Sequence, residues 1–138
     1  MSAATRHREE IAEGLRERGY SVNALARSES GAARLHAIGA TVSLGDITDR
    51  ESMREGMRDS DVVFHIAAIY QFTPEALARA ESVNVGGTRN VLELAVELGV
   101  PRIVYTSTVA VFGDTRGKIA DETYYAGEPF LSEYDRTK

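Results

Sequence analysis

Hydrophobic and polar positions along the chain switch repeatedly between the spacing of a helix and the spacing of a strand. Early in the chain, Ile11, Ala12 and Leu15 lie on one helical face among charged residues, and Gly19 follows where a helix stop is expected. Residues 62–68 instead form a near-continuous apolar run, which is typical of a parallel strand covered on both faces. The repeated alternation predicts an α/β protein.

Capping residues and turn formers mark the boundaries of the other elements. Ser30 is the expected cap of the second helix, and Thr48 with Glu51 has the spacing of a capping box for the third. The expected helices cover 8–18, 30–36, 49–58 and 74–99, and the expected strands cover 21–26, 41–44, 62–68 and 102–108. A long loop is expected over 113–132. Right-handed crossovers would arrange these elements as a doubly wound parallel sheet with helices on both faces.

Composition narrows the class of protein. The 138 residues suffice for one domain, and 43% hydrophobic with 27% charged residues is typical of a folded, soluble one. Scattered basic residues and a net charge of −5 argue against nucleic-acid binding. The absence of cysteine removes disulfides, thiolate metal sites and a cysteine nucleophile. No apolar stretch is long enough to span a membrane and the start of the chain lacks the features of a signal peptide, so a cytoplasmic protein is expected.

The strongest chemical signal is Tyr134 followed four residues later by Lys138. On a helix the two side chains lie on the same face, where an ammonium group lowers the pKa of a phenol and prepares it for proton transfer. Three hydroxyl residues, Thr106, Ser107 and Thr108, end the last expected strand. Open α/β sheets bind their ligands at this edge, although β-branched residues are also common filler in strands.

Other polar residues have a structural interpretation beside the functional one. Asp46 follows a strand and could bind an adenine amino group, whereas a turn aspartate is the commoner role. His65 is expected to be a core residue rather than a metal ligand, because no second ligand lies at a useful spacing. Gly86 and Gly87 interrupt a helical run, which suggests a close packing contact. No metal site is expected.

Several ordered segments together resemble one family. They are FHIAA, SVNVGGTRNVLELA, RIVYTSTVAVFGD and SEYDRTK, with Thr108, Tyr134 and Lys138 at their expected places. This set resembles the extended short-chain dehydrogenase/reductases, the NAD(P)-dependent epimerase/dehydratase family, over about residues 11–138. Its closest likeness is to dihydroflavonol-4-reductase-like and sugar-epimerase-like members.

The resemblance implies a Rossmann-like three-layer fold and a role for each matching residue. Tyr134 would be the acid/base, Lys138 would hold the nicotinamide ribose, and Thr108 would bind the reacting substrate oxygen, with Ser107 a weaker candidate. Asn84 would stabilise the active-site helix. The cofactor-binding positions implied are Arg27, Asp46, Ile47, Ile66, Ala67, Ala68, Asn84, Thr106, Tyr134 and Lys138. Because Arg27 stands where NAD-preferring members carry an acid, NADP is favoured over NAD.

The resemblance also predicts which parts of the family's fold this chain lacks. Ser2, Thr5 and Arg8 stand where the three glycines of the phosphate loop belong, so weak cofactor binding is expected. The first strand and the C-terminal substrate part are expected to be absent, as in a chain cut at both ends. Residues 1–138 would then form a partial NAD(P)-binding domain with a gap between the strands at 21–26 and 62–68.

The resemblance implies an oxidoreductase, epimerase or dehydratase that transfers a hydride on a sugar-nucleotide or another carbonyl or alcohol substrate. The sequence does not choose among these reactions. Its expected partner is a small-molecule substrate, with no nucleic acid and no membrane, and a homodimer is left open for the complete enzyme. Two alternatives also stay open: a non-catalytic binding or regulatory module, and an inactive truncated gene product.

Overall fold

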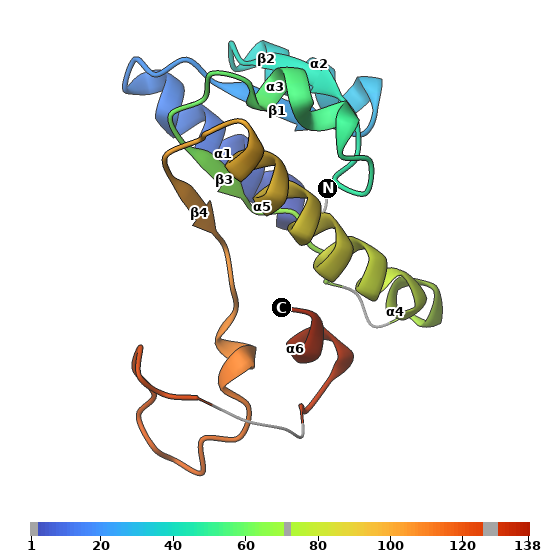
Figure 1. Ribbon diagram of the computed structural model, residues 1–138, viewed down its shortest axis with the longest axis vertical. Coiled ribbons are helices and arrows are strands. Elements are labelled where there is room, and N and C mark those ends of the chain that lie inside the picture. Colours follow the sequence, from blue (N-terminus) through green and yellow to red (C-terminus); the bar gives the residue numbers. More distant parts are fainter. Residues whose placement is uncertain (1–2, 71–72, 126–129) are drawn as a thin grey trace.

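The computed structural model describes residues 3–70, 73–125 and 130–138 (Figure 1). The α-helices are α1 (Ala3–Glu17), α2 (Glu29–Ala37), α3 (Arg54–Met57), α4 (Pro74–Ala80), α5 (Thr88–Glu97) and α6 (Glu133–Thr137). The strands are β1 (Asn23–Ala26), β2 (Thr41–Leu44), β3 (Val63–His65) and β4 (Ile103–Tyr105). Two 3₁₀ turns, η1 (Glu51–Met53) and η3 (Val109–Phe112), and a π-helical segment, η2 (Glu81–Gly87), complete the elements.

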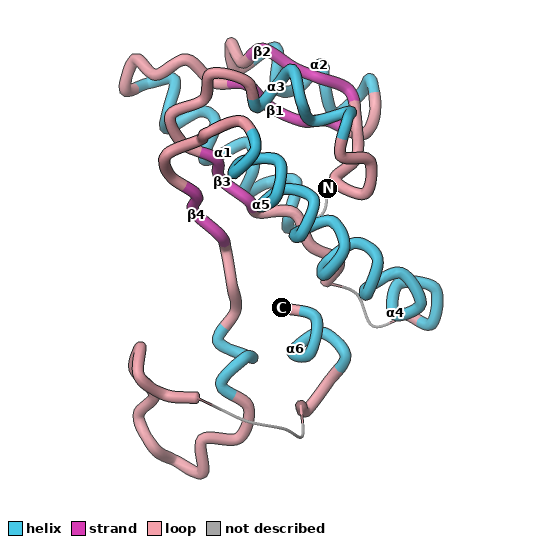
Figure 2. Tube along the Cα trace, viewed as in Figure 1, coloured by secondary structure: helices cyan, strands magenta, loops and turns pink. Residues whose placement is uncertain are grey.

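The strands form two parallel pairs. β1 pairs with β2, and β3 pairs with β4, in two separate two-stranded sheets. This confirms the α/β class and the parallel pairing, and it also confirms the expected gap, because β1 and β3 do not pair. Figure 2 shows how short the strands are compared with the helices and with the long loop that follows β4.

The open edge of β1 is partly filled by a side chain from α1. The carbonyl of Ala26 accepts a hydrogen bond from Gly45 N at 2.9 Å, on the β2 side. Because successive carbonyls of a strand point to opposite sides, that of Leu25 points toward the gap. There Arg8 donates from Nη1 to the Leu25 carbonyl at 3.2 Å. The residues before β1 therefore form a helix beside the gap and not the central strand.

Helices cover both faces of the β1–β2 pair. One core cluster joins α1 and α2 to one face and consists of Ala12, Ala26, Ala32, Leu35 and Ala40. The other joins η1, α3, η2 and α5 and consists of Ile47, Met53, Met57, Val83, Val91, Leu94 and Ala95. Leu25 packs against the second cluster, whereas its neighbours Ala24 and Ala26 belong with the first, as strand alternation requires.

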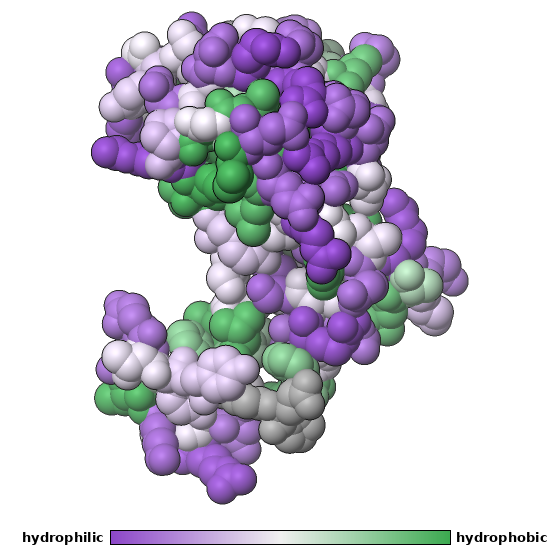
Figure 3. All heavy atoms as spheres, viewed as in Figure 1, coloured by the Kyte–Doolittle hydropathy of each residue, from purple (hydrophilic) through white to green (hydrophobic). Residues whose placement is uncertain are grey.

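Part of the β3–β4 pair is open. Val63 and Ile103 pack against the larger core cluster, whereas the next residues, Phe64 and Val104, are exposed. Figure 3 shows a hydrophobic patch where β4 and the end of α5 lie, on a surface that is otherwise mostly hydrophilic. Among the described residues, no helix combines the length and the apolar character needed to cross a membrane.

Three helices end at a glycine, as the sequence predicts. Gly19, Gly39 and Gly99 have φ angles of +83°, +84° and +70°, a conformation that glycine adopts without strain. In each case the glycine N–H and the following N–H bond back to carbonyls of the last helical turn. The expected start of α4 is also confirmed, because the hydroxyl of Thr73 accepts a hydrogen bond from Ala76 N.

Two predicted helix starts are wrong. The second helix is capped by Ser28, whose Oγ accepts from Gly31 N, and not by Ser30. The capping box before the third helix does not form, because Thr48 binds Asp46. That region is therefore a 3₁₀ turn followed by the single turn of α3, and not one helix over 49–58.

Other predicted bounds change as well. α1 begins at Ala3 and not at residue 8, since good helix formers precede its amphipathic part. The strands expected over 62–68 and 102–108 are shorter, because their mutual ladder ends where Thr106 N donates to His65 O. Between residues 113 and 132, the described residues contain no helix or strand, which confirms the expected loop.

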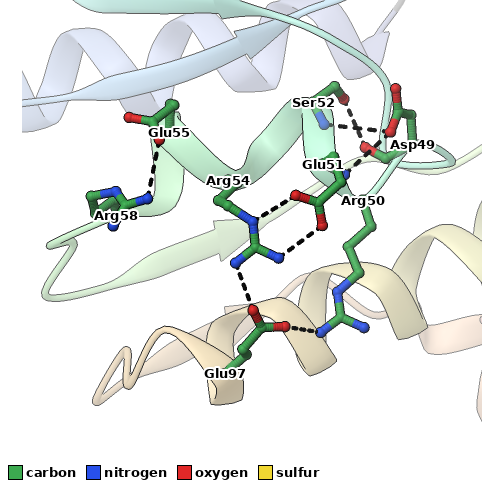
Figure 4. Close-up of polar contacts among 8 residues, drawn as sticks. All are labelled: Asp49, Arg50, Glu51, Ser52, Arg54, Glu55, Arg58 and Glu97. Atoms are coloured by element: carbon green, nitrogen blue, oxygen red, sulfur yellow. Dashed lines mark hydrogen bonds and ion pairs between the residues drawn. The ribbon is translucent and has the colours of Figure 1, made fainter.

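An ion-pair network joins η1 and α3 to α5. Figure 4 shows Arg54 between Glu51 and Glu97, with Arg50 paired to the same Glu97. Hydrogen bonds from Arg54, with further help from Arg50, hold the pKa of Glu97 below its ordinary value. Each exposed pair contributes little by itself, so the network mainly fixes how these elements lie above their shared core.

The expected helix over 74–99 is continuous, with η2 between α4 and α5. The expected packing contact belongs to Gly87 alone. A Cβ at Gly87 would lie 2.5 Å from Cδ1 and 2.6 Å from Cγ1 of Ile47, whereas a Cβ at Gly86 would meet nothing closer than 3.9 Å. Ile47 is itself buried in the core. Gly87 therefore lets η2 approach the turn after β2 closely.

Gly87→Ala is expected to lower the free energy of unfolding by about 1–3 kcal/mol, because the methyl group overpacks the core at Ile47. The neighbouring change Gly86→Ala is the matched control and is expected to raise it by about 0.5–1 kcal/mol, since alanine is the better helix former. Chemical denaturation of both variants measures the difference. Equal stabilities would contradict the packing role of Gly87.

Candidate active site and cofactor pocket

The residues singled out from the sequence lie mainly just after the carboxyl ends of the four strands. Arg27 follows β1, Asp46 and Ile47 follow β2, Ile66, Ala67 and Ala68 follow β3, and Thr106, Ser107 and Thr108 follow β4. Ligands of open α/β sheets bind in this position. Tyr134 and Lys138 belong to the helical segment that ends the chain, and Asn84 lies in η2.

α6 is a short helix with a well-formed start. The hydroxyl of Ser132 accepts from Asp135 N at 3.2 Å and donates to the carboxylate of the same residue at 2.7 Å. Arg136 then forms ion pairs with Glu133 and, at 2.6 Å, with Glu81 at the start of η2. Figure 1 shows α6 beside α4, and the ion pair with Glu81 ties the side of α6 to the start of η2.

Asn84 joins this helix to the segment after β3. Its Oδ1 accepts from Ile69 N at 2.7 Å, and its Nδ2 donates to Ile69 O at 3.2 Å and to Thr137 Oγ1 at 3.0 Å. The side chain is 2% exposed, and its bond to Thr137 is fully buried, whereas the two bonds to Ile69 are partly buried. The π-helical winding of η2 surrounds Asn84, and such segments are frequent at functional sites.

Lys138 lies against the end of β4. Its Nζ donates to the carbonyl of Thr106 at 2.6 Å and lies 4.6 Å from the centre of the Tyr105 ring. Burial lowers the pKa of the Lys138 ammonium group. The contacts therefore bring the C-terminal helical segment to the edge of the sheet where the hydroxyl residues are.

Tyr134 and Thr108 lie on the two elements that meet here. Thr108 caps η3 by accepting a hydrogen bond from Ala110 N at 3.3 Å, and η3 packs against α6. Tyr134, on α6, meets the ring of Tyr70 edge to face at 4.8 Å. Ser107 is exposed. The tertiary structure thus places the helix of Tyr134 and Lys138 against the turn that Thr108 begins.

His65 is buried, as expected of a core residue. Its Nε2 forms a hydrogen bond with Thr88 Oγ1 at 2.8 Å, and its ring stacks on Tyr105 at 5.3 Å. Burial, with a smaller effect of the Lys138 charge, lowers the pKa of His65 to about 4. The imidazole is therefore neutral near pH 7. Thr88 and Tyr105 both lie within segments that carry the family resemblance, but nothing in their spacing along the chain marks them as partners of His65.

A second site lies at the carboxyl ends of β1 and β2. It is a pocket of about 420 Å³ lined by Arg8, Arg27, Ser28, Gly31, Arg34 and Asp46. Arg27 lies 3.9 Å from the carboxylate of Asp46. Arg34 binds Glu9 of α1 at 2.7 Å. The sequence singles out Arg27 and Asp46, but Arg34 joins them only because α2 turns back over β1.

The pocket carries an excess of positive charge. Burial lowers the pKa of Arg8; Glu9 opposes that effect, and the neighbouring Arg34 and Arg27 add to it. The buried Nε of Arg8 has no hydrogen-bond partner. An anion bound among these guanidinium groups would relieve their mutual repulsion.

Asp46 has the turn role considered from the sequence and also lines the pocket. Its Oδ1 accepts from Thr48 N at 3.0 Å and from Thr48 Oγ1 at 2.9 Å, which is the turn role. Burial raises its pKa, but these hydrogen bonds and the charge of Arg27 outweigh burial, so the pKa lies below its ordinary value. The same carboxylate lines the pocket. The side chain of Ile47, by contrast, is buried in the core.

Comparison with known proteins identifies the family. Residues 21–138 match the model of the 3-beta hydroxysteroid dehydrogenase/isomerase family. The chain belongs to this family. A similar relative is a 4-hydroxy-2-methyl-3-oxo-4-farnesyl-3,4-dihydroquinoline-1-oxide ketoreductase of Stigmatella aurantiaca, 40% identical over 88% of this chain and 36% of the relative. A putative dihydroflavonol 4-reductase of Synechocystis is 38% identical over 90% of this chain and 36% of its own length.

Solved structures of short-chain dehydrogenase/reductases and epimerases share the fold of this chain. A UDP-glucose 4-epimerase of Thermus thermophilus in complex with NAD has a TM-score of 0.79 and 28% identity, over 94% of this chain and 43% of that one. A short-chain dehydrogenase/reductase superfamily protein of Agrobacterium tumefaciens with bound NAD has a TM-score of 0.76 and 26% identity, over 94% of this chain and 38% of that one. The resemblance to the extended short-chain dehydrogenase/reductases is therefore confirmed, and the chain spans 36–43% of the length of these relatives.

Proposed function

We propose that this chain provides the NADP-binding and proton-transfer residues of a reductase or dehydrogenase that acts on a carbonyl or alcohol carbon. The observation that carries the proposal is the docking of Lys138 at the carboxyl end of β4, with Nζ 2.6 Å from the carbonyl of Thr106. This contact holds the helix of Tyr134 beside the turn that Thr108 begins. Ketoreductase and dihydroflavonol reductase relatives support the reaction class.

The described residues fit the adenosine end and the nicotinamide end of such a cofactor better than the pyrophosphate between them. The arginine pocket suits a phosphorylated adenosine, and the end of β4 suits the nicotinamide side. Thr5 and Arg8, which occupy two of the three glycine positions of the phosphate loop, lie inside α1. Ser2, at the other position, lies outside the described residues. A helix in place of the glycine turn supports the expectation of weak binding.

When bound, the nicotinamide ring would donate or accept the hydride. The residues of this chain would handle the proton and the substrate oxygen. Tyr134 would give a proton to that oxygen in reduction and remove it in oxidation. Lys138 would stabilise the phenolate by its charge and would bind the ribose hydroxyls with its remaining N–H donors. Thr108 would orient the substrate oxygen by a hydrogen bond.

The preference for NADP rests on the charge of the pocket. Arg27 lies directly after β1, and Arg8 and Arg34 line the same pocket from α1 and α2. NAD presents a neutral hydroxyl at the ribose 2′ position, which gains little from three guanidinium groups, whereas the 2′-phosphate of NADP would pair with them.

This preference can be measured on the chain itself with the adenosine end of the cofactor. Adenosine 2′,5′-bisphosphate is expected to bind about 10–100-fold more tightly than 5′-AMP, because the two differ only by the phosphate that the arginines would bind. Arg27→Ala is expected to remove most of the difference. Calorimetric titration of both nucleotides measures it.

Arg58→Ala is the control, since Arg58 pairs with Glu55 on the exposed side of α3, outside the pocket. It is expected to leave both affinities unchanged. Equal affinity of the unmodified chain for the two nucleotides would contradict the NADP preference, and so would a loss of affinity in Arg58→Ala as large as in Arg27→Ala.

A further inference from the structure

Tyr105, the last residue of β4, contacts both ends of Lys138. Its hydroxyl donates to the backbone oxygen of Lys138 at 3.2 Å, and its ring lies under the Nζ of the same residue at 4.6 Å. We infer that Tyr105 is the positioning residue of Lys138: the ring holds the ammonium group by a cation–π contact, and the hydroxyl holds the backbone from which that side chain extends. The inference rests on the proposed function only for the role of Lys138 in binding the ribose and stabilising the phenolate.

Lysine needs such positioning contacts because its side chain is flexible. Its four-carbon side chain has about 2 kcal/mol of rotamer entropy, and one hydrogen bond alone fixes the ammonium group poorly. The carbonyl of Thr106 accepts one of its three N–H donors. The Tyr105 ring attracts the charge without using a second N–H, because its face is electron-rich. Two donors therefore stay available for a ligand.

His65 supports the ring. His65 and Tyr105 are register partners in the β3–β4 ladder, and their rings stack at 5.3 Å with 23° between the planes. The hydrogen bond between His65 Nε2 and Thr88 fixes the imidazole in turn. Because the imidazole is neutral near pH 7, it adds no second cation to the ring that holds Lys138.

Other charged groups line the surface pocket that contains Lys138 and Tyr105. They are Arg89 and Glu93 of α5 and Arg136 of α6. Arg136 is paired with Glu81 and Glu133, and Glu93 is paired with Arg50. Among the described residues, no Asp or Glu side chain lies within salt-bridge distance of Lys138. Its Nζ instead contacts the Tyr105 ring and the Thr106 carbonyl.

The arrangement can be tested by NMR on the chain as it is, without cofactor. The sequence has only two lysines, Lys118 in the loop and Lys138, so their side-chain signals are readily told apart. Protons above an aromatic ring are shifted upfield by its ring current. In the ¹³C,¹⁵N-labelled chain, the ε-methylene protons of Lys138 are therefore expected upfield of those of Lys118.

Two variants separate the ring from the hydroxyl. Tyr105→Phe keeps the ring and is expected to keep the upfield shift, whereas Tyr105→Leu is expected to lose it while the Lys118 signal stays unchanged. Tyr125→Leu, at an exposed tyrosine of the loop, is the control and is expected to change neither lysine. If Tyr105→Leu does not fold, the unmodified chain and Tyr105→Phe decide the question by themselves.

The outcomes distinguish this inference from the proposed function. Coincident lysine signals in the unmodified chain, or an upfield shift that survives Tyr105→Leu, would overturn the role of Tyr105. An upfield shift of Lys138 in a chain that does not bind adenosine 2′,5′-bisphosphate would support the positioning role and count against the proposed function instead.

Discussion

Replacing Tyr134 by phenylalanine is expected to lower turnover by about 10²–10⁴-fold, the range for loss of a positioned acid or base, while cofactor binding is retained. The variant keeps the ring that packs against Tyr70 and removes only the hydroxyl. The measurement is the rate of NADPH oxidation with a carbonyl substrate, in an active enzyme that contains this segment. One such enzyme is a chimera in which residues 21–138 replace the matching part of a family member.

The companion change Lys138→Met should lower both turnover and cofactor affinity, because it removes the charge proposed to stabilise the Tyr134 phenolate and the donors proposed for the ribose. Combining it with Tyr134→Phe should cost little more than the worse single change, since residues that act as one unit are not additive. An unreduced rate in Tyr134→Phe would refute the assignment and favour a non-catalytic binding module.

Asn84→Ala is expected to lower the free energy of unfolding by about 2–5 kcal/mol. The change leaves the N–H and the carbonyl of Ile69 without their partner in a partly buried position, and each such group costs about 1–3 kcal/mol. It also removes the bond to Thr137 that ties α6 to η2. Thermal unfolding measures the total loss, and limited proteolysis is expected to cut near α6 first.

Asn90→Ala is the matched control, because Asn90 lies on α5, is half-buried, and donates one side-chain hydrogen bond, to Ile47 O. Its expected loss is about 1 kcal/mol, with no change in proteolysis near α6. If the two alanine variants were equally stable, Asn84 would not be the link between the segment after β3 and the last helix.

Features that depend on neighbouring residues could be predicted from the sequence. The stops at Gly19, Gly39 and Gly99 follow from the need for a positive φ angle, and the start of α4 follows from Thr73 and Pro74. Competing local choices could not be resolved in the same way. Ser28 and Ser30 both suit a cap, and the backbone selects Ser28 because its hydroxyl meets Gly31 N.

The candidate site was predicted only in part. The Tyr134 and Lys138 spacing and the hydroxyl residues after β4 are visible in the sequence, because each set is local. The arginine pocket is not, since Arg8 and Arg34 reach Arg27 from helices on other parts of the chain. Tyr105 likewise gains its role only when α6 returns to β4.

The sequence by itself determined the α/β class, most element positions, the family resemblance and the local residues of the proposed chemistry, because periodicity, capping and spacing act within a few residues. The tertiary structure decided which distant groups meet: the helix beside the gap between two sheets, the bonds of Asn84 to Ile69 and Thr137, and the contact of Tyr105 with Lys138. These contacts depend on how the helices pack over the strands. Packing joins residues that are far apart along the chain, and no local pattern in the sequence predicts which of them meet.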